Sequence, residues 1–472
     1  MSYLDNIDFI TIAFNLQPHQ IKTISSSLTD GIFHIFLSLN PHEKDCPFCG
    51  GKIKIQGYTE RTLHHSPAFS HPCIIHWKRT RFICKDCSKT FSEENIFSPE
   101  HFRHTYPVLH QIAIDLKNPH FTFEDIAKKH NISITLAMLY ADSFLQVPRL
   151  RLPVNLGIDE IHSDMAKFDG AYLCTFVDNN YRCLNEILPD RSKRTLSKHL
   201  EKIPLDERKR VKFVTMDMWQ PYKDVSLKYF PNAIICIDNF HVVSHVCDNF
   251  SRFRIDLMNS YVHGSPAYYL LKHWHKLLET DKYNLDYDNP PKYNSYFRQH
   301  LNYRDLYDML LSLNPTLTLA YNLKEKYRLF NKNATEDNCE AQLDQLIKEF
   351  YDANLPFYQE FLSILTNWRT EIINSFKRPF DNRKQSNALA EYMNGRLRNL
   401  IDNANGYSNF ERFRSRALYC FNDHLMYSLT QKLFSANKKK LDPRGKYNKK
   451  SNNLLSTSPD NIIEDDPMFS EE

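Results

Sequence analysis

The sequence predicts a multidomain α/β protein whose central domain is a mixed sheet covered by helices. Five short apolar runs within residues 151–240 have the pattern of strands, and amphipathic stretches typical of helices alternate with them after the third run. Two Cys-x-x-C pairs precede this region and a long helix-rich stretch follows it. The chain has 472 residues, of which 42% are apolar and 25% charged, as in ordinary globular proteins.

Four of the 11 cysteines form the two pairs, which are Cys46 with Cys49 and Cys84 with Cys87. A Cys-x-x-C places two thiolates on one tight turn, and two such turns complete a closed tetrahedral site for structural Zn²⁺. Strands are expected at residues 52–59 and 73–83, so we predict N-terminal strands and a zinc ribbon over residues 1–100. The alternative is a pair of redox thiols or chance spacing. The His and Cys residues between the pairs are expected to be bystanders, because the pairs already fill the zinc shell.

A basic stretch lies beside the second pair, at residues 78–82. Lys78, Arg79 and Arg81 are expected to contact the phosphates of a nucleic acid. The alternative, a solvated face of the strand, fits the pattern equally well.

Residues 121–144 have the outline of a helix-turn-helix, which we place in a DNA-binding domain over residues 101–150. Thr122 is expected to cap the first helix, whose first turn is acidic. Residues 130–133 are expected to form the turn. The second helix would then run through Leu136, Leu139 and Tyr140 and enter a major groove. A helical hairpin of another function has the same outline.

Two carboxylates stand at the ends of strands that are expected to be neighbours. Asp159 follows the first strand, at residues 156–158, and Asp217 follows the fourth, at residues 211–216. If these strands pair, the two carboxylates lie side by side and repel each other unless a cation lies between them. Mg²⁺ prefers oxygen ligands, and pairs of such ions cut or join phosphodiesters. The sequence therefore predicts a site for Mg²⁺ (or Mn²⁺) at this edge of the sheet.

A third carboxylate is expected from a helix at residues 386–400. Helical spacing brings four polar side chains to one face, namely Asn387, Glu391, Asn394 and Arg398. Its apolar face consists of Leu389, Met393, Leu397 and Leu400. Arg396 and Arg398 are expected to contact DNA phosphates, because residues 376–416 carry nine Lys or Arg against four Asp or Glu. The alternative is a solvated helix.

Other side chains compete for this site. Glu160 ranks second to Asp159, because a continuing strand turns it to the other face. Asp238 ends the fifth strand and is a candidate fourth carboxylate. His241 and His245 have the spacing of metal ligands but lack the glutamate of a zincin, so they are interpreted as structural or phosphate-facing.

Together these motifs resemble the transposases of the ISL3 group of bacterial insertion sequences, which have a ribonuclease-H-like DDE domain. The matching pieces occur in the family's order: CPFCGG, KRTRFICKDC, the helix-turn-helix, GIDE, MDMWQPY, IDNFHVV and SNALAEYMNGRLR. The resemblance covers most of the chain, to about residue 435. It implies a metal-binding catalytic triad of Asp159, Asp217 and Glu391.

The resemblance also implies a DNA transposase, which binds the terminal inverted repeats of its element and catalyses metal-dependent strand cleavage and strand transfer. The expected partners are double-stranded DNA and a second copy of the chain in a homodimer. The expected location is the bacterial cytoplasm, in association with the nucleoid. Two alternatives stay open, which are a catalytically inactive DNA-binding regulator and a nuclease without strand transfer.

The spacing of the triad predicts an insertion. Asp217 and Glu391 are 174 residues apart, which is more than a compact ribonuclease-H fold needs. We therefore predict the first part of the DDE domain at 151–252, a helical insertion at 253–380, the catalytic helix with the remainder of the domain at 381–435, and a disordered tail at 436–472.

Several classes of protein are excluded by what the sequence lacks. Its 10 glycines form no phosphate-cradling loop, so no nucleotide cofactor is expected. No apolar run approaches the length of a membrane span, so no membrane partner is expected. Residues 1–10 have no basic n-region, so we expect no secretory signal.

Overall fold

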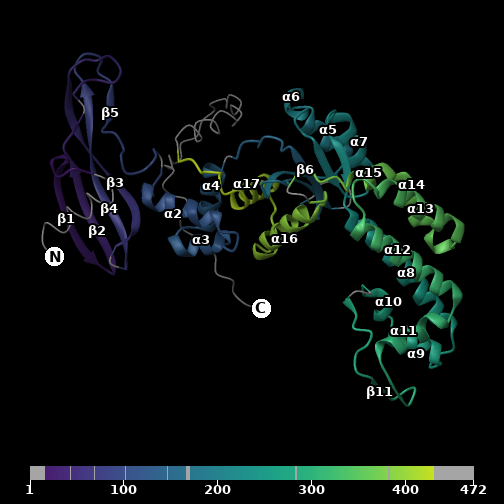
Figure 1. Ribbon diagram of the computed structural model, residues 1–472. Coiled ribbons are helices and arrows are strands. Elements are labelled where there is room, and N and C mark those ends of the chain that lie inside the picture. Colours follow the sequence, from purple (N-terminus) through teal and green to yellow (C-terminus); the bar gives the residue numbers. More distant parts are fainter. Residues whose placement is uncertain are drawn as a thin grey trace, which may run out of the picture.

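The structure is a computed structural model, and it describes residues 16–429 apart from 43, 69, 101, 146, 166–170, 282–283 and 381–382. The tail predicted to be disordered, 436–472, lies outside the described residues. So do residues 1–10, for which no secretory signal was expected. The chain forms an N-terminal sheet, then a three-helix unit, then a mixed sheet with its covering helices. A helical arm extends away from the mixed sheet (Figure 1).

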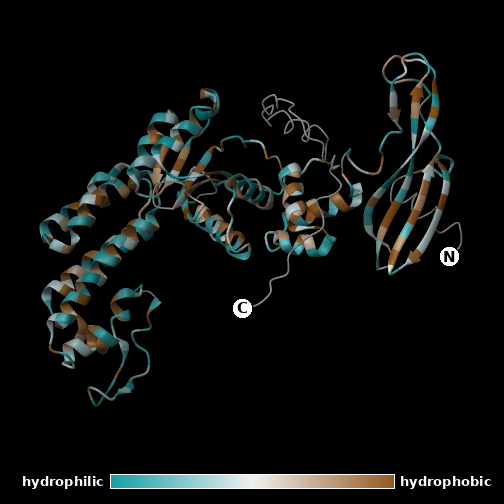
Figure 2. Cartoon of the chain, turned by 180° about the vertical axis from the view of Figure 1, so that it is seen from behind, coloured by the Kyte–Doolittle hydropathy of each residue, from teal (hydrophilic) through white to brown (hydrophobic). Residues whose placement is uncertain are grey.

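The N-terminal sheet contains β1 (Ile21–Thr29), β2 (Ile32–Leu39), β3 (Ile53–Ala68), β4 (His71–Cys84) and β5 (Thr90–Ser92), after the short helix η1 (Pro18–Gln20). The strand order is β1-β2-β4-β3, and β5 pairs with β4. The strands predicted at 52–59 and 73–83 are confirmed as parts of β3 and β4, which pair antiparallel. Hydrophobic and hydrophilic stretches alternate along these strands (Figure 2). Trp77 on β4 is fully buried, and its ring packs edge-on against that of Phe97 in the loop after β5.

The three-helix unit consists of α2 (Tyr106–Lys117), α3 (Phe123–His130) and α4 (Ile134–Phe144). Both predicted helices are present, whereas α2 was not predicted. The Thr122 hydroxyl accepts the N–H of Asp125 and caps α3, as expected. Asn131 ends α3 with a φ of 50°, a left-handed conformation that asparagine tolerates, and Ser133 then caps α4.

The mixed sheet contains β6 (Asn155–His162), β7 (Tyr172–Asp178), β8 (Cys183–Leu188), β9 (Phe213–Met216) and β10 (Ile234–Ile237). Its order is β10-β9-β6-β7-β8. Strands β10, β9 and β6 run parallel, and β7 and β8 are antiparallel to their neighbours. The predicted pairing of the first strand with the fourth is confirmed, because Ile158 on β6 pairs with Met216 on β9.

Helices cover both faces of this sheet. They are α5 (Lys193–Leu200), α6 (Leu205–Arg208), α7 (Gln220–Tyr229), α16 (Ala388–Asn403) and α17 (Phe410–Phe421). Leu156 and Ile158 share a buried cluster with α5 and α7, whereas Ile161 shares one with α16 and α17. Since side chains alternate along a strand, Asp159 points to the α16 face and Glu160 to the α7 face.

The helical arm lies between α7 and α16 in the sequence. It contains α8 (Asn239–Ser260), α9 (Pro266–His273), α10 (Lys276–Glu279), β11 (Lys292–Asn294), β12 (Gln299–Leu301), α11 (Tyr303–Ser312), α12 (Pro315–Asn333), α13 (Cys339–Ala353), η3 (Pro356–Tyr358) and α14 (Gln359–Asn367). The next helix, α15 (Arg369–Asn374), packs beside β10. Because α8 is a single helix, it continues without a break through residue 253, where the insertion was predicted to begin.

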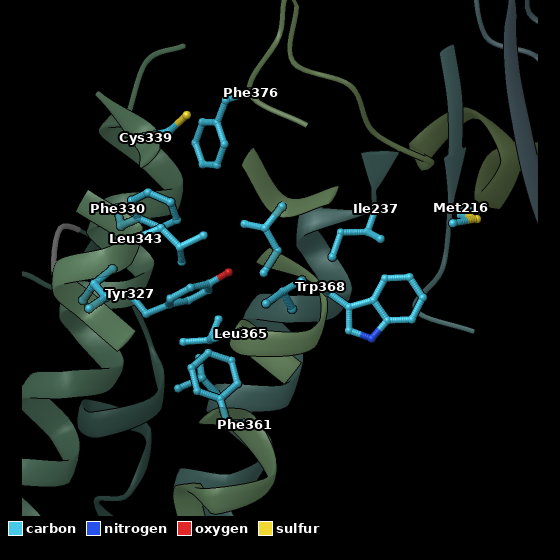
Figure 3. Close-up of a cluster of buried hydrophobic side chains, with 14 of the residues drawn as sticks. Met216, Ile237, Tyr327, Phe330, Cys339, Leu343, Phe361, Leu365, Trp368 and Phe376 are labelled. Atoms are coloured by element: carbon cyan, nitrogen blue, oxygen red, sulfur yellow. The ribbon is translucent and has the colours of Figure 1, made fainter. Parts of the chain in front are cut away.

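One buried hydrophobic cluster runs from the sheet into the arm. Met216 and Ile237, at the ends of β9 and β10, lie in the same cluster as Tyr327 and Phe361 from the arm (Figure 3). The base of the arm therefore shares its core with the mixed sheet. Among the described residues, no helix is both long and apolar enough to cross a membrane.

Candidate active site

A buried carboxylate, Asp159, and a half-buried one, Asp217, lie at neighbouring positions where two parallel strands meet one edge of the sheet. Asp159 directly follows Ile158, Asp217 directly follows Met216, and Ile158 and Met216 are paired across β6 and β9. The Asp217 side chain is 23% exposed, and Asp159 is 6% exposed. Strand β9 ends at Met216, so the chain turns at Asp217 before α7 begins.

Hydrogen bonds fix the orientation of the Asp159 carboxylate. The Asn394 side-chain N–H donates to Asp159 Oδ2 over 2.8 Å, and the Glu160 backbone N–H donates to Oδ1 over 2.7 Å. Asn394 also donates to the Glu160 carbonyl oxygen and accepts a hydrogen bond from the Thr175 hydroxyl on β7. Helix α16 is thereby tied to two strands at the level of the carboxylate.

Glu391 reaches the same place from the first turn of α16. His241, in the first turn of α8, lies between two carboxylates, because its Nε2 is 3.2 Å from Asp217 Oδ1 and 3.5 Å from Glu391 Oε1. Asp238 caps the N-terminus of α8, and its ligand atoms lie within 4.8 Å of those of His241 and Glu391. The structure thus places Asp159 and Asp217 at the same edge of the sheet as Glu391. Among the described residues, however, the ligand atoms that lie within 4.8 Å of one another are those of Asp238, His241 and Glu391, so only Glu391 of the predicted triad belongs to this cluster.

The electrostatics of this edge disfavour negative charge. Burial, together with the charge of the nearby Asp217, raises the pKa of Asp159 to about 8. Burial also raises the pKa of Asp217 to about 6, although His241 acts in the opposite direction. Burial raises the pKa of Asp238 as well. A bound cation would stabilise the ionised forms of all three side chains.

The donor set fits a hard divalent cation. Asp217 Oδ1 is buried, and no group among the described residues donates a hydrogen bond to it. His241 Nε2 is near this oxygen but lacks hydrogen-bond geometry. A buried carboxylate oxygen without a hydrogen-bond donor has the chemistry of a Mg²⁺ or Mn²⁺ ligand.

Glu160 is engaged on the opposite face of β6. Arg191 donates to its Oε1 over 2.6 Å, and the Tyr222 hydroxyl donates to its Oε2 over 3.0 Å. The guanidinium of Arg191 in turn lies 4.3 Å from the ring centres of Tyr172 and Trp219. The lower rank of Glu160 as a ligand agrees with these contacts, which already hold both of its oxygens.

The four cysteines of the N-terminal region form one cluster, with all Sγ atoms within 4.8 Å of one another. The Sγ atoms of Cys46 and Cys87 are 3.7 Å apart, and those of Cys49 and Cys84 are 3.5 Å apart. Backbone N–H groups of Cys87 and Asp86 donate to Cys84 Sγ, and they lower the pKa of this thiol to about 7. The predicted four-thiolate site for structural Zn²⁺ is confirmed as a site that fits the metal.

The predicted DNA-contacting side chains differ in how free they are. Lys78 and Arg81 are exposed on β4, whereas Arg79 donates to the Glu93 carbonyl oxygen and lies 3.4 Å from Glu100. On α16, Arg398 is exposed, whereas the guanidinium of Arg396 lies 4.4 Å from the ring centre of Phe421. Their contact with DNA stays a prediction.

Two features of the site went beyond the sequence pattern. His241 was interpreted as structural or phosphate-facing, yet its ring faces two carboxylates. The signal in the sequence was its position three residues after Asp238 on a helix, which places the two side chains close together. Asn387 and Asn394 were placed on a polar face with Glu391, but they are 0% and 2% exposed. They are buried because their amides bond to β6, as when Asn387 donates to the Ile158 carbonyl oxygen over 3.1 Å.

Comparisons with known proteins match two parts of the chain. A family model described as transposase, of the ISL3 DDE type, matches residues 156–417. The zinc-finger of the transposases of IS204, IS1001, IS1096 and IS1165 matches residues 43–87. The transposase for insertion sequence element IS1001 of Bordetella parapertussis is 25% identical over 252 residues, which are 51% of this chain and 60% of that protein. The match therefore spans less than two thirds of the length of this relative.

Proposed function

Because this chain belongs to the ISL3 family of transposases, we propose that it is the DNA transposase of an insertion sequence. In this proposal it binds the terminal inverted repeats of its element and catalyses metal-dependent strand cleavage followed by strand transfer. The observation that carries the proposal is the convergence of Asp159, Asp217 and Glu391, which are distant in the sequence, on one edge of the mixed sheet.

The side chains have separate roles in this proposal. Asp159, Asp217 and Glu391 hold Mg²⁺ (or Mn²⁺), with Asp238 beside them. When bound there, the metal would supply an activated water and would stabilise the charge on the reacting phosphodiester oxygens. Asn394 keeps the Asp159 carboxylate turned toward the site, and Arg191 keeps Glu160 on the opposite face.

His241 acts as a hydrogen-bond donor at the mouth of the site. Its side chain is 35% exposed, so one side of the ring remains open to a DNA phosphate while Nε2 faces Asp217 and Glu391. A contact of His241 with phosphate stays a prediction, beside its observed proximity to the two carboxylates.

The zinc ribbon and the three-helix unit recognise DNA in this proposal. Helix α4 contains no Lys or Arg, so phosphate contacts come from other segments, such as Lys78 and Arg81 on β4. Ile134 and Leu139 are large apolar side chains exposed on α4, with 43% and 53% of their surface open. Such side chains contact thymine methyl groups in a major groove. A homodimer would hold the two transposon ends together.

Cleavage of a labelled transposon-end duplex in the presence of Mg²⁺ or Mn²⁺ tests the proposal. The wild type is expected to produce metal-dependent 3′-hydroxyl ends. Asp217→Asn is expected to bind the same duplex and to produce none, because the amide is a poor ligand for a hard cation. Asp206→Asn is the matched control, since Asp206 is an exposed carboxylate on α6.

Equal cleavage by the wild type and Asp217→Asn would remove Asp217 from the site. Specific binding by both proteins without any cleavage would replace the transposase by a DNA-binding regulator. Cleavage without joining of the 3′-hydroxyl to a target duplex would restrict the function to a nuclease.

A further inference from the structure

A polar cavity of about 680 Å³ lies at the beginning of β6, beside the first turn of α16. Three parts of the chain line it, which are the first residue of β6, the turn between β7 and β8, and the segment that leads into α16. Its volume is in the range of pockets that bind small organic groups. None of the catalytic carboxylates lines it.

Buried amides without partners gather at this cavity. Asn155 lines it and is 5% exposed; its Nδ2 donates to Asn180 Oδ1, but no described residue donates to its Oδ1. Asn179 also lines it, and neither end of its buried amide has a partner in the described part of the chain. Burying unpaired amide groups is costly, so their presence points to a ligand with both donors and acceptors.

Gly157 makes room for this arrangement. A Cβ atom at this position would lie 2.9 Å from Asn179 Oδ1 and 3.2 Å from Asn387 Oδ1, which is closer than side chains normally approach. Asn387 is fully buried next to the cavity, and its Oδ1 also lacks a donor among the described residues. The glycine in β6 therefore lets two amides from distant parts of the sequence meet beside the strand.

The turn between β7 and β8 holds an aromatic ring at the rim. The Asp178 carboxylate accepts the backbone N–H groups of Asn180 and Tyr181, and the Asp178 carbonyl oxygen accepts that of Arg182. The turn is thus well fixed, yet the Tyr181 side chain is 83% exposed. An exposed ring on a fixed turn is suited to stack on another flat ring at a low cost in conformational entropy.

We infer that this cavity binds one unpaired nucleotide of DNA. The amides of Asn155 and Asn179 meet the edge of the base, because an amide offers a donor and an acceptor as a base edge does. Tyr181 stacks on the base, and Arg182, together with the N-terminus of α16, contacts its phosphate. The inference rests on the proposed function, since it takes DNA as the substrate.

The cavity lies close to one of the carboxylates that are proposed to bind the metal. Ala388 lines the cavity and is three residues before Glu391 on the same helix, which is about 5 Å along the helix axis. The bound nucleotide is therefore close to the phosphodiester that the carboxylates act on. Holding it out of the duplex would fix the strand relative to Glu391.

Binding of two fluorescein-labelled single strands of equal length to the full chain tests this inference. One strand carries all its bases, and the other has a central run of abasic residues with the same number of phosphates. The wild type is expected to prefer the strand with bases. Tyr181→Ala is expected to reduce this preference by about fivefold to a hundredfold, the range of one lost stack of a base on an aromatic ring.

Two further variants separate stacking from charge. Tyr351→Ala is the matched control, because Tyr351 is a tyrosine with 70% exposure on α13 in the arm, and it is expected to keep the preference. Arg182→Asn removes the guanidinium charge, and asparagine tolerates the left-handed φ of 55° at this position. This variant is expected to weaken the binding of both strands equally. The slope of log binding constant against log salt concentration should fall by about one, the contribution of one phosphate contact.

The outcomes distinguish the cavity from the proposed function. Tight binding of both strands with no preference in the wild type would overturn the nucleotide site and leave the transposase proposal intact. An undiminished preference in Tyr181→Ala would also overturn the site. Failure to bind either strand, or any duplex, would overturn both proposals.

Discussion

At the scale of single residues, Asn394 illustrates how the catalytic edge is assembled. A pattern of helical spacing gives this residue the same face as Glu391, but its amide lies inside the protein between α16, β6 and β7. Every polar atom of the side chain has a partner there. Such a fully bonded amide can hold a carboxylate whose burial opposes its charge.

Asn394→Ala is therefore expected to reduce metal-dependent cleavage by about tenfold or more, because a hydrogen bond to a charged group contributes about 1.5–3 kcal/mol. The measurement is the rate of cleavage of the transposon-end duplex, with DNA affinity measured in parallel. Asn399→Ala provides the control, since Asn399 is exposed on the same helix. If the two variants cleave equally fast, Asn394 has no part in positioning Asp159.

A glycine beside the zinc site leaves room for the side chain of Asp86. A Cβ atom at Gly51 would lie 2.0 Å from Asp86 Oδ2, and this carboxylate accepts the backbone N–H of Lys52 across the two cysteine turns. Gly57 on β3 has no atom within 4 Å of the same position. The two glycines thus differ in what an added methyl group would meet.

Gly51→Ala is expected to destabilise the zinc ribbon by about 1–3 kcal/mol, the usual cost of forced overpacking. Release of Zn²⁺ to a coloured chelator should be faster in Gly51→Ala than in the wild type, while Gly57→Ala should match the wild type. Equally slow release by all three proteins would show that Asp86 moves away without consequence for the metal.

At the scale of elements, α17 joins the mixed sheet to the three-helix unit. Arg414 makes a two-pronged ion pair with Glu186 on β8, at 2.6 Å for both contacts, and the Glu186 side chain is 4% exposed. Arg412, on the same helix, makes a similar pair with Asp142 on α4, whose side chain is 40% exposed. The two pairs have the same geometry and differ in burial.

Arg414→Ala is expected to lower the free energy of unfolding by about 3–5 kcal/mol, because it leaves the Glu186 charge buried without a partner. Arg412→Ala, the matched control, is expected to cost at most about 1 kcal/mol, since its partner remains solvated. Chemical denaturation of both variants measures the difference. Similar losses in the two variants would contradict the dependence on burial.

Much of this level of organisation follows from sequence patterns. Apolar runs predict the strands, and the position of Asp217 directly after such a run places it beside Asp159 once the strands pair. The burial of Asn387 does not follow, because it depends on tertiary contacts between α16 and β6. The contact of His241 with Glu391 depends likewise on the packing of α8 against α16, although the spacing of His241 from Asp238 places it at the same end of the strand. The continuity of α8 through residue 253 is likewise hidden, since no Pro, Gly or charge change marks the transition from sheet domain to arm.

At the scale of the whole molecule, histidines join the N-terminal sheet to the three-helix unit. His64 on β3 accepts and donates backbone hydrogen bonds with Thr105 and Arg103, and its ring stacks on that of His104. His65 Nδ1 lies 2.8 Å from the Thr105 hydroxyl, and His104 Nδ1 lies 2.7 Å from the Tyr140 hydroxyl on α4. The contact between the two units thus contains two buried imidazoles, those of His65 and His104, beside the exposed His64.

This junction is expected to weaken in acid. Burial lowers the pKa of His65 and of His104 to about 4, below their ordinary value of 6.5. The unfolded chain then binds more protons than the folded chain between these values, so stability is fully present above pH 6.5 and is lost as the pH falls toward 4. At pH 5 the loss is about 2 kcal/mol for each histidine, at about 1.4 kcal/mol per pH unit.

Thermal unfolding and limited proteolysis at pH 7 and pH 5 measure this loss of stability. His104→Leu should reduce the pH dependence, whereas His120→Leu, which changes an exposed histidine, should leave it unchanged. Identical pH profiles for the wild type and His104→Leu would show that His104 does not carry this dependence.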